Sequence, residues 1–72
     1  MEVVQQALSD YGASLTHDGY IVSKSGKQLS VRVTIQRGRI RFEGSHGLLA
    51  SGPIAERTVQ KFVESFWFWK RQ

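Results

Sequence analysis

The chain opens with apolar side chains at intervals of three and four residues: Val3, Val4, Ala7, Leu8 and Tyr11. This spacing places them on one face of an α-helix over residues 2–11. Gly12 follows directly and can adopt the left-handed conformation that often ends a helix. The pattern therefore predicts an N-terminal amphipathic helix that stops at Gly12.

Beyond residue 13 the period changes to two, which is typical of β-strands with one buried face. Three dipeptides that end in glycine interrupt the alternation: Asp18-Gly19, Ser25-Gly26 and Arg37-Gly38. We interpret each as a two-residue hairpin loop, because glycine accepts the positive φ that such loops need. The resulting register opposes His17 to Tyr20, Leu15 to Val22, Val22 to Leu29, Ile35 to Ile40, and Val33 to Phe42.

Directly opposed residues share a sheet face, so this register predicts one mostly apolar face and one polar, basic face. Arg32 falls opposite Glu43 on the polar face, where we expect a cross-strand ion pair. Ile21 is the misfit on that face. A bulge or a longer turn near Ser25-Gly26 would move it inward, because a one-residue slip inverts every side chain of a strand. The polar face otherwise carries Thr16, Ser23, Gln28, Ser30, Arg32, Thr34, Gln36, Arg39, Arg41 and Glu43.

A second helical pattern begins near Pro53, which suits a first helical turn because no N–H is needed there. Its apolar stripe consists of Ala55, Val59, Phe62, Phe66 and Trp69, with Val63 on the flank. The stretch FEGSHGLLASGP, residues 42–53, is interpreted as the chain leaving the sheet, with Leu48 and Leu49 filling the space between layers. The predicted fold is α+β: an N-terminal helix, an antiparallel meander of three to four strands and a C-terminal helix, with both helices on one face of the sheet.

A chain of 72 residues is too short for two hydrophobic cores, so we expect a single small domain over residues 1–72. It has no cysteine and two histidines, which exclude disulfides and the common zinc ligand sets; we expect no metal and no cofactor. No apolar run approaches the roughly 20 residues that span a bilayer, and no signal-peptide pattern opens the chain. We therefore expect a cytoplasmic protein that does not bind a membrane.

The formal net charge is +4, and the basic residues concentrate in the middle third of the chain. Residues 20–42 contain no acid but six basic side chains: Lys24, Lys27, Arg32, Arg37, Arg39 and Arg41. Such a distribution indicates a surface that meets phosphate or an acidic protein. The alternative is a solvated sheet whose charges only protect its edges from aggregation.

The C-terminal segment SFWFWKRQ, residues 65–72, contains four consecutive aromatic residues, which one amphipathic helix cannot bury together. Exposed apolar surface of this kind usually marks a contact. Three interpretations stay open. The aromatic residues fold back on the N-terminal helix; they form a homodimer interface through the C-terminal helix; or Trp67 and Phe68 hold a partner, beside the basic residues Arg57, Lys61, Lys70 and Arg71.

His46, between Ser45 and Gly47, is the candidate for general acid–base catalysis. A catalytic histidine normally needs an orienting partner, and the nearby carboxylate in the sequence, Glu43, is already assigned to Arg32. We therefore favour a solvated loop histidine. His17 is expected to lie half-buried beside Tyr20 on the apolar face.

The order of helix, antiparallel meander and helix resembles in outline the double-stranded-RNA-binding domain and the small HicA-type toxins. In the RNA-binding family the second helix opens with a lysine-rich signature, whereas the matching stretch here, ASGPIAERTV, contains no lysine. In HicA-type toxins the catalytic histidine follows a glycine-containing motif on the first strand, whereas His17 precedes Asp18-Gly19. The resemblance therefore assigns the chain to neither family.

The leading hypothesis is a small non-catalytic module that binds nucleic acid, RNA or a single strand, through the basic sheet face. One alternative is a protein-interaction or inhibitor module of the phage or mobile-element type, which would bind an acidic protein surface through its C-terminal aromatic residues. Another is a small ribonuclease that depends on His46 or His17. The predicted binding residues are Lys24, Lys27, Arg32, Arg37, Arg39, Arg41, Arg57, Lys61, Trp67, Phe68, Lys70 and Arg71.

Overall fold

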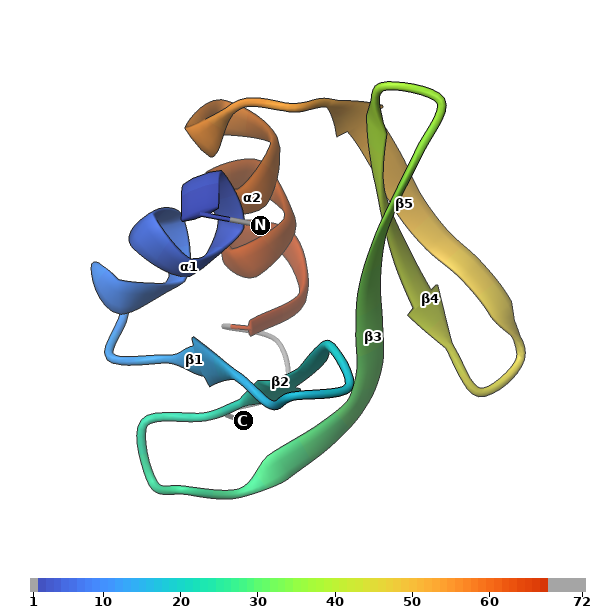
Figure 1. The fold of residues 1–72 in the computed structure, drawn as a ribbon. Helices are drawn as coiled ribbons and strands as arrows, with labels where there is room; N and C mark the ends of the chain where they lie inside the picture. The colour runs from blue at the N-terminus through green and yellow to red at the C-terminus, as the bar shows by residue number, and fades with distance from the viewer. Residues whose placement is uncertain (1, 68–72) are drawn as a thin grey trace.

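The structure, a computed structural model, describes residues 2–67 apart from the side chains of Phe66 and Trp67. Its elements follow the order predicted from the sequence, with a helix first, then an antiparallel sheet, then a helix (Figure 1). They are α1 (Glu2–Ser9), β1 (Ser14–Leu15), β2 (Tyr20–Val22), β3 (Gln28–Gln36), β4 (Arg39–Gly44), β5 (Gly47–Pro53), α2 (Glu56–Phe62) and the π-helical segment η1 (Val63–Trp67). The predicted α+β fold class is confirmed.

The strands form a five-stranded meander in the order β1-β2-β3-β4-β5, and every neighbouring pair is antiparallel. The long strand β3 bends, so that the sheet curves around α1 and α2, which lie together on its concave side (Figure 1). We call this helix-covered side the inner face and the opposite side the outer face. The two faces have different compositions, and this difference organises the rest of the molecule.

Helix α1 packs its apolar stripe into the core, against α2 and β1, with Val4, Ala7 and Leu8 all fully buried. It ends at Ser9, two residues before the predicted limit. Gly12 then takes a φ of 75°, and its amide donates to the Ser9 carbonyl at 3.0 Å. The predicted left-handed stop is thus confirmed, preceded by a short turn.

The β3–β4 hairpin has the register that the sequence predicts. Arg37 and Gly38 form a two-residue loop, both with positive φ, and Gln36 lies opposite Arg39. The predicted pairs of Ile35 with Ile40, Val33 with Phe42 and Arg32 with Glu43 are confirmed as Cα partners.

The registers predicted for the first two hairpins are wrong by one residue, because their loops contain three residues instead of two. The amide of Thr16 donates to the carbonyl of Tyr20, and the amide of Ser23 donates to the carbonyl of Lys27, both at 2.8 Å. Each loop ends in a glycine with a φ near +90°, the left-handed position of a three-residue hairpin loop. Leu15 therefore opposes Ile21 in place of Val22, Ser14 opposes Val22, and Val22 opposes Gln28 in place of Leu29.

This slip resolves the misfit of Ile21, which lies fully buried on the inner face. The register of β2 against β3 also shifts between Tyr20 and Val22, the irregularity expected if Ile21 turns inward. Tyr20 consequently opposes Arg32 and lies on the outer face, and the loop residue His17 is exposed. The predicted half-buried position of His17 beside Tyr20 is wrong for the same reason.

Residues 47–53 continue the sheet as strand β5, so the interpretation that the chain leaves the sheet here is wrong. Ser45 and His46 form the tip of the β4–β5 hairpin, and Gly44 lies opposite Gly47. Because β5 extends the sheet edge, Leu48 and Leu49 are 51% and 42% exposed and do not fill the space between the layers. The sheet consequently has five strands in place of the three to four predicted.

The second helix starts at Glu56, because Pro53 is still the last residue of β5. Proline is tolerated there since β5 is an edge strand. The inward positions Val59, Phe62 and Val63 are buried, as the predicted stripe requires. Ala55 is half-buried at the residue before the helix, and the rest of that stripe, the Phe66 side chain and Trp69, lies outside the described part of the chain.

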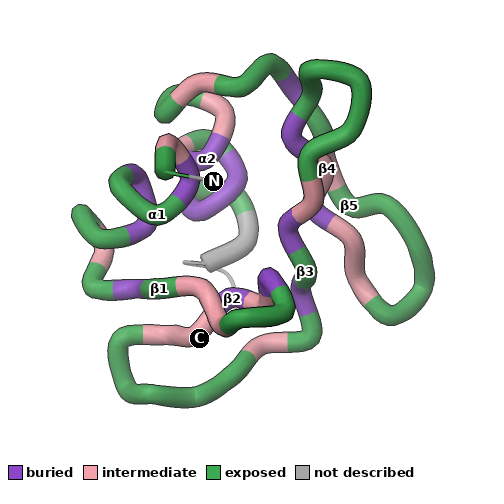
Figure 2. The backbone as a smooth tube through the Cα atoms, viewed as in Figure 1, coloured by how far each residue is buried: buried purple, intermediate pink, exposed green. Residues whose placement is uncertain are grey.

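The core lies between the helices and the inner face, where buried positions alternate along the strands (Figure 2). The rings of Phe42 and Phe62 stack at a centroid distance of 4.0 Å and join β4 to α2. At Gly52 a Cβ atom would come within 2.8 Å of Thr58 Cγ2, so glycine permits the close approach of α2 to β5. The buried core residues are Val4, Ala7, Leu8, Ala13, Ile21, Val31, Val33, Ile40, Phe42, Val59, Phe62 and Val63.

Candidate functional site

The outer face of the sheet is mostly polar and carries a row of arginines. Because Thr34 lies opposite Arg41 and Gln36 opposite Arg39, these side chains share one surface. Strand β5 extends it, with Ser51 opposite Arg41. The residues of this surface are Tyr20, Arg32, Thr34, Gln36, Arg39, Arg41, Glu43 and Ser51, together with Leu48 and Pro53 of β5, which lie opposite Glu43 and Arg39.

A shallow hollow of about 270 Å³ lies at the end of this surface near the β3–β4 turn. Arg39 and Arg41 line it from β4, and Arg37 lines it from the turn. Hydroxyl and amide groups of Ser51 and Gln36 complete the lining. Within the described residues, neither Arg37 nor Arg39 has an ion pair or a side-chain hydrogen bond, so both guanidinium groups are available to an anion.

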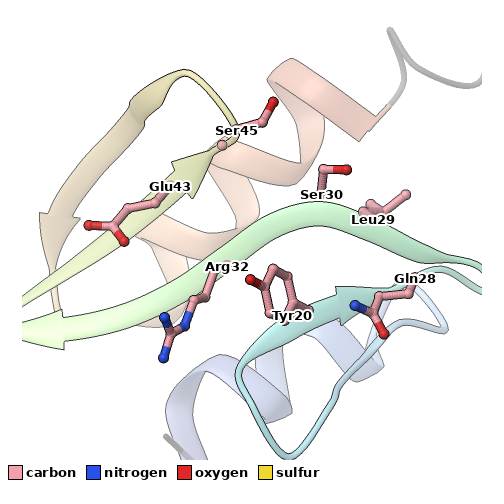
Figure 3. Close-up of a pocket in the computed structure, with 8 residues that line it drawn as sticks. Tyr20, Gln28, Leu29, Ser30, Arg32, Glu43 and Ser45 are labelled. Carbon is pink, nitrogen blue, oxygen red and sulfur yellow. The ribbon is translucent and has the colours of Figure 1, made fainter.

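A larger hollow of about 560 Å³ lies at the other end, where β2, β3 and β4 meet. Figure 3 shows Tyr20, Arg32 and Glu43, one from each of these strands, beside the hollow. The rest of the lining is mostly polar and comes from Gln28, Leu29, Ser30, Gly44 and Ser45. An aromatic ring in a polar, arginine-containing hollow is able to contact a flat polar ligand.

The expected ion pair of Arg32 with Glu43 does not form. Glu43 pairs with Arg41 on its own strand, where Arg41 Nε lies 3.2 Å from Glu43 Oε2. Arg32 turns the other way and donates from Nε to the backbone carbonyl of Asp18 at 3.2 Å. The three-residue loop of the first hairpin brings that carbonyl within reach, so the slip in register also redirects Arg32. One arginine of the outer face is thus partly neutralised by a carboxylate.

Four further predicted site residues, Lys24, Lys27, Arg57 and Lys61, lie outside the strands that form the outer face. Lys24 lies in the loop between β2 and β3, and a Cβ added at Gly12 would come within 3.0 Å of its Cγ, so its stem lies near the end of α1. Lys27 is exposed at the end of the same loop. Arg57 and Lys61 are exposed on α2, in the helical layer.

The C-terminal candidates cannot be placed. Trp67 ends η1, but its side chain is outside the described structure. Phe68, Lys70 and Arg71 also lie outside the described residues. The fold-back, homodimer and protein-partner interpretations of this segment therefore remain predictions.

The two histidines lie in different exposed turns, His17 between β1 and β2 and His46 between β4 and β5. Neither makes a hydrogen bond to a carboxylate among residues 2–67. The ribonuclease hypothesis thus has no catalytic partner within the described part of the chain. No cluster of three or more His, Cys, Asp or Glu side chains that fits a metal ion occurs in that part either.

Sequence reasoning missed Tyr20 as a surface residue because it placed this side chain on the apolar face. A signal was present, because the stretches THDGY, residues 16–20, and SKSGK, residues 23–27, share one pattern. In each, the first hydroxyl accepts from the amide of the fifth residue, at 3.0 Å for Thr16 and 3.2 Å for Ser23. A hydroxyl residue three positions before glycine thus indicates the three-residue loop.

Comparisons with protein-family models, with curated protein sequences and with solved structures find no match to this chain. Among the described residues, no helix is both long enough and apolar enough to cross a membrane.

Proposed function

We propose that this chain is a non-catalytic module that binds nucleic acid, RNA or a single strand, through the outer face of its sheet. The observation that carries the proposal is the gathering of Arg32, Arg37, Arg39 and Arg41 along β3, β4 and their turn. Glu43 is the one carboxylate on this surface within the described chain. Guanidinium groups in such a row provide phosphate contacts without reading base sequence.

The conformation of Arg37 supports a role for its charge. Its φ of 54° places a residue with a long side chain in the left-handed region, where the turn favours asparagine or glycine. The left-handed conformation costs a residue with a Cβ atom roughly 1–2 kcal/mol. A strained residue that the fold does not need is a reason to look for a function.

The shape of the surface favours a polymeric anion over a small molecule as the ligand. Small-molecule sites are usually concave and mostly apolar, and they enclose most of the ligand. Both hollows here are shallow and lined mainly by polar side chains, and they lie along one continuous surface. A backbone that follows the row of arginines makes several phosphate contacts at once.

The salt dependence of binding tests the proposal. Labelled single-stranded RNA, single-stranded DNA and duplex DNA of equal length are titrated with the purified chain between 50 and 200 mM salt. Three to four phosphate contacts give a slope of about −2 to −3 in log K against log salt for a single strand. Binding that hardly changes over this range would contradict phosphate contacts.

Two matched charge reversals locate the binding surface. Arg39→Glu and Arg57→Glu change the net charge equally, but Arg39 lies on the outer face and Arg57 on α2. We expect Arg39→Glu to weaken binding at least about tenfold, because a like charge against a phosphate costs several kcal/mol. Arg57→Glu should change it less than about threefold, through long-range charge alone. Equal losses in both variants would indicate that net charge, and not this face, binds the nucleic acid.

A third variant in the same assay should change the binding affinity in the opposite direction. Glu43→Gln removes the carboxylate that holds Arg41 at 3.2 Å and leaves the shape of the site nearly unchanged. We expect it to strengthen binding by about two- to threefold, with little effect on the fold because exposed ion pairs contribute at most about 1 kcal/mol. Weaker binding in Glu43→Gln would contradict the placement of the phosphates.

A further inference from the structure

Tyr20 is the aromatic residue that the register of β2 turns onto the outer face. It lies opposite Arg32, is half-buried, and lines the larger hollow (Figure 3). Within the described chain its hydroxyl makes no hydrogen bond and its ring stacks on no other aromatic ring. The ring thus serves neither the core nor a polar network of the protein.

The surroundings of Tyr20 hold it at a defined edge of the hollow. Its backbone amide donates to Thr16 Oγ1 at 3.0 Å, which fixes the strand at the turn. Arg32 lies opposite Tyr20 and is held there, because its Nε donates a hydrogen bond to the carbonyl of Asp18 and its Cγ is close to Gly19. A rigid ring beside a positioned guanidinium group needs little ordering when a ligand binds.

Several polar groups line the same hollow as this ring. Gln28 and Ser30 from β3 and Ser45 from the β4–β5 turn line it together with Arg32 (Figure 3). Amide and hydroxyl groups both donate and accept hydrogen bonds, so they suit the edge of a planar heterocycle. The hollow therefore combines a face for stacking with groups that reach the edge of a stacked ring.

We propose that Tyr20 stacks an unpaired base of single-stranded nucleic acid while the arginines near the β3–β4 turn hold its phosphates. The inference rests on the proposed function and narrows its ligand to a single strand, because a paired base does not expose its face. Arg32 and Gln36 are four residues apart on β3, which separates the two hollows by about 13 Å. One strand running along β3 reaches both.

Substitutions at Tyr20 test this assignment with a single-stranded oligonucleotide and with a matched abasic strand of the same length and charge. Tyr20→Ala should weaken binding of the normal strand by about 5- to 150-fold, the loss usual for a stacking aromatic residue. Tyr20→Phe keeps the ring and should bind within about twofold of the unchanged chain. Tyr20→Leu keeps apolar bulk without a π-face, and it should resemble Tyr20→Ala.

The abasic strand separates stacking from a general loss of structure. It offers the same phosphates without bases, so the unchanged chain, Tyr20→Ala and Tyr20→Leu should bind it within about twofold of one another. A variant that binds the abasic strand normally is folded at the arginines. RNA and DNA strands are compared in parallel, and stacking predicts the same pattern for both.

The outcomes distinguish this inference from the proposed function. If Arg39→Glu abolishes binding while Tyr20→Ala binds the normal strand as the unchanged chain does, the stacking assignment is overturned and the phosphate surface stands. Preference for duplex over single strand also overturns it. If the unchanged chain binds no oligonucleotide in low salt, the proposed function and the stacking assignment are both overturned.

Discussion

The inner and outer faces of strands β3 and β4 are built on the same backbone but carry opposite chemistry. On the inner face, Val33, Ile40 and Phe42 are at most 1% exposed. On the outer face, their sequence neighbours Arg32, Arg39 and Arg41 reach solvent, and Arg41 is the least exposed of them. Packing dictates the first set, whereas the fold sets few requirements for the second. Chemistry on the outer face is therefore the better guide to function.

Truncation of a core ring should give the largest difference between the faces. Phe42→Ala removes the ring that stacks on Phe62, and we expect a loss of about 3–5 kcal/mol in the free energy of unfolding. Arg41→Ala, the adjacent residue on the outer face, should cost less than about 1 kcal/mol. Urea unfolding followed by circular dichroism measures both. Similar losses would show that the outer face is also part of the packing.

Glycine substitutions in the first two hairpin loops, the first of which turns Tyr20 outward, should have an intermediate effect on the free energy of unfolding. Gly19 and Gly26 have φ values of 91° and 89°, but only at Gly19 would an added Cβ meet backbone, 3.0 Å from the Val33 carbonyl oxygen. We expect Gly26→Ala to cost about 1–2 kcal/mol from the left-handed conformation alone. Gly19→Ala should cost roughly 1 kcal/mol more, because backbone cannot move aside cheaply. Unfolding curves of the two variants give the difference, and equal costs would contradict the close contact of the loop with β3.

The smallest effect on stability is expected at Tyr11, in the helical layer that covers the inner face. Partial burial of the ring, followed by the charge of Glu64, raises the pKa of Tyr11; its hydroxyl lies 3.4 Å from Glu64 Oε2, and Asp10 adds to the rise. The unfolded chain loses this proton first, at about pH 10, so stability should fall as the pH rises above that value.

Tyr11→Phe removes the titrating group, so the stability of this variant should decline less between pH 10 and the pKa of the folded chain. Thermal unfolding at pH 8 and above pH 10 makes the comparison. At pH 8 the two chains should differ by less than about 0.5 kcal/mol, because a contact of 3.4 Å is a weak hydrogen bond. An identical alkaline decline in both chains would show that Tyr11 does not contribute to it.

The sequence predicts the fold class and the β3–β4 hairpin because their signals are local. The helical spacing of Val4 and Leu8 and the loop Arg37-Gly38 each determine structure within a few residues. In the first two hairpins the loop length depends on the hydroxyls of Thr16 and Ser23, which dipeptide rules do not consider. A single miscounted residue per loop then reverses the faces of β2.

Strand β5 escapes prediction because its sequence, GLLASGP, combines strand-breaking residues with no clear alternation. Two of its features depend on tertiary contacts: Gly52 admits Thr58 of α2, and Pro53 occupies an edge. Neither is visible without the neighbouring elements. The stretch interpreted as the exit from the sheet is therefore a strand that the rest of the fold specifies.

The candidate site likewise contains features that the sequence predicts and features that depend on the register. The arginines of β3 and β4 are placed on one surface by alternation alone, so the sequence predicts their grouping. The partners of Arg32 and Glu43 and the position of Tyr20 depend on the slipped register, so the sequence does not predict them. Lys24, Arg57 and Lys61 are basic but lie elsewhere, because charge alone does not fix position.

The edges of the sheet bear on how the chain behaves at high concentration. Arg39 pairs with Gln36 next to the β3–β4 loop, so its backbone N–H and C=O point towards β3 and away from β5. Pro53 lies opposite Arg39 on β5, and its backbone nitrogen therefore faces the free edge of the sheet. This nitrogen carries no hydrogen and cannot donate to another strand. An irregularity further along β5 disturbs its regular pairing, and at the other margin β1 is only two residues long. Among residues 2–67, neither margin of the sheet is a long, regular template for strands of other molecules, so both edges disfavour edge-to-edge pairing even though the sheet does not close into a barrel.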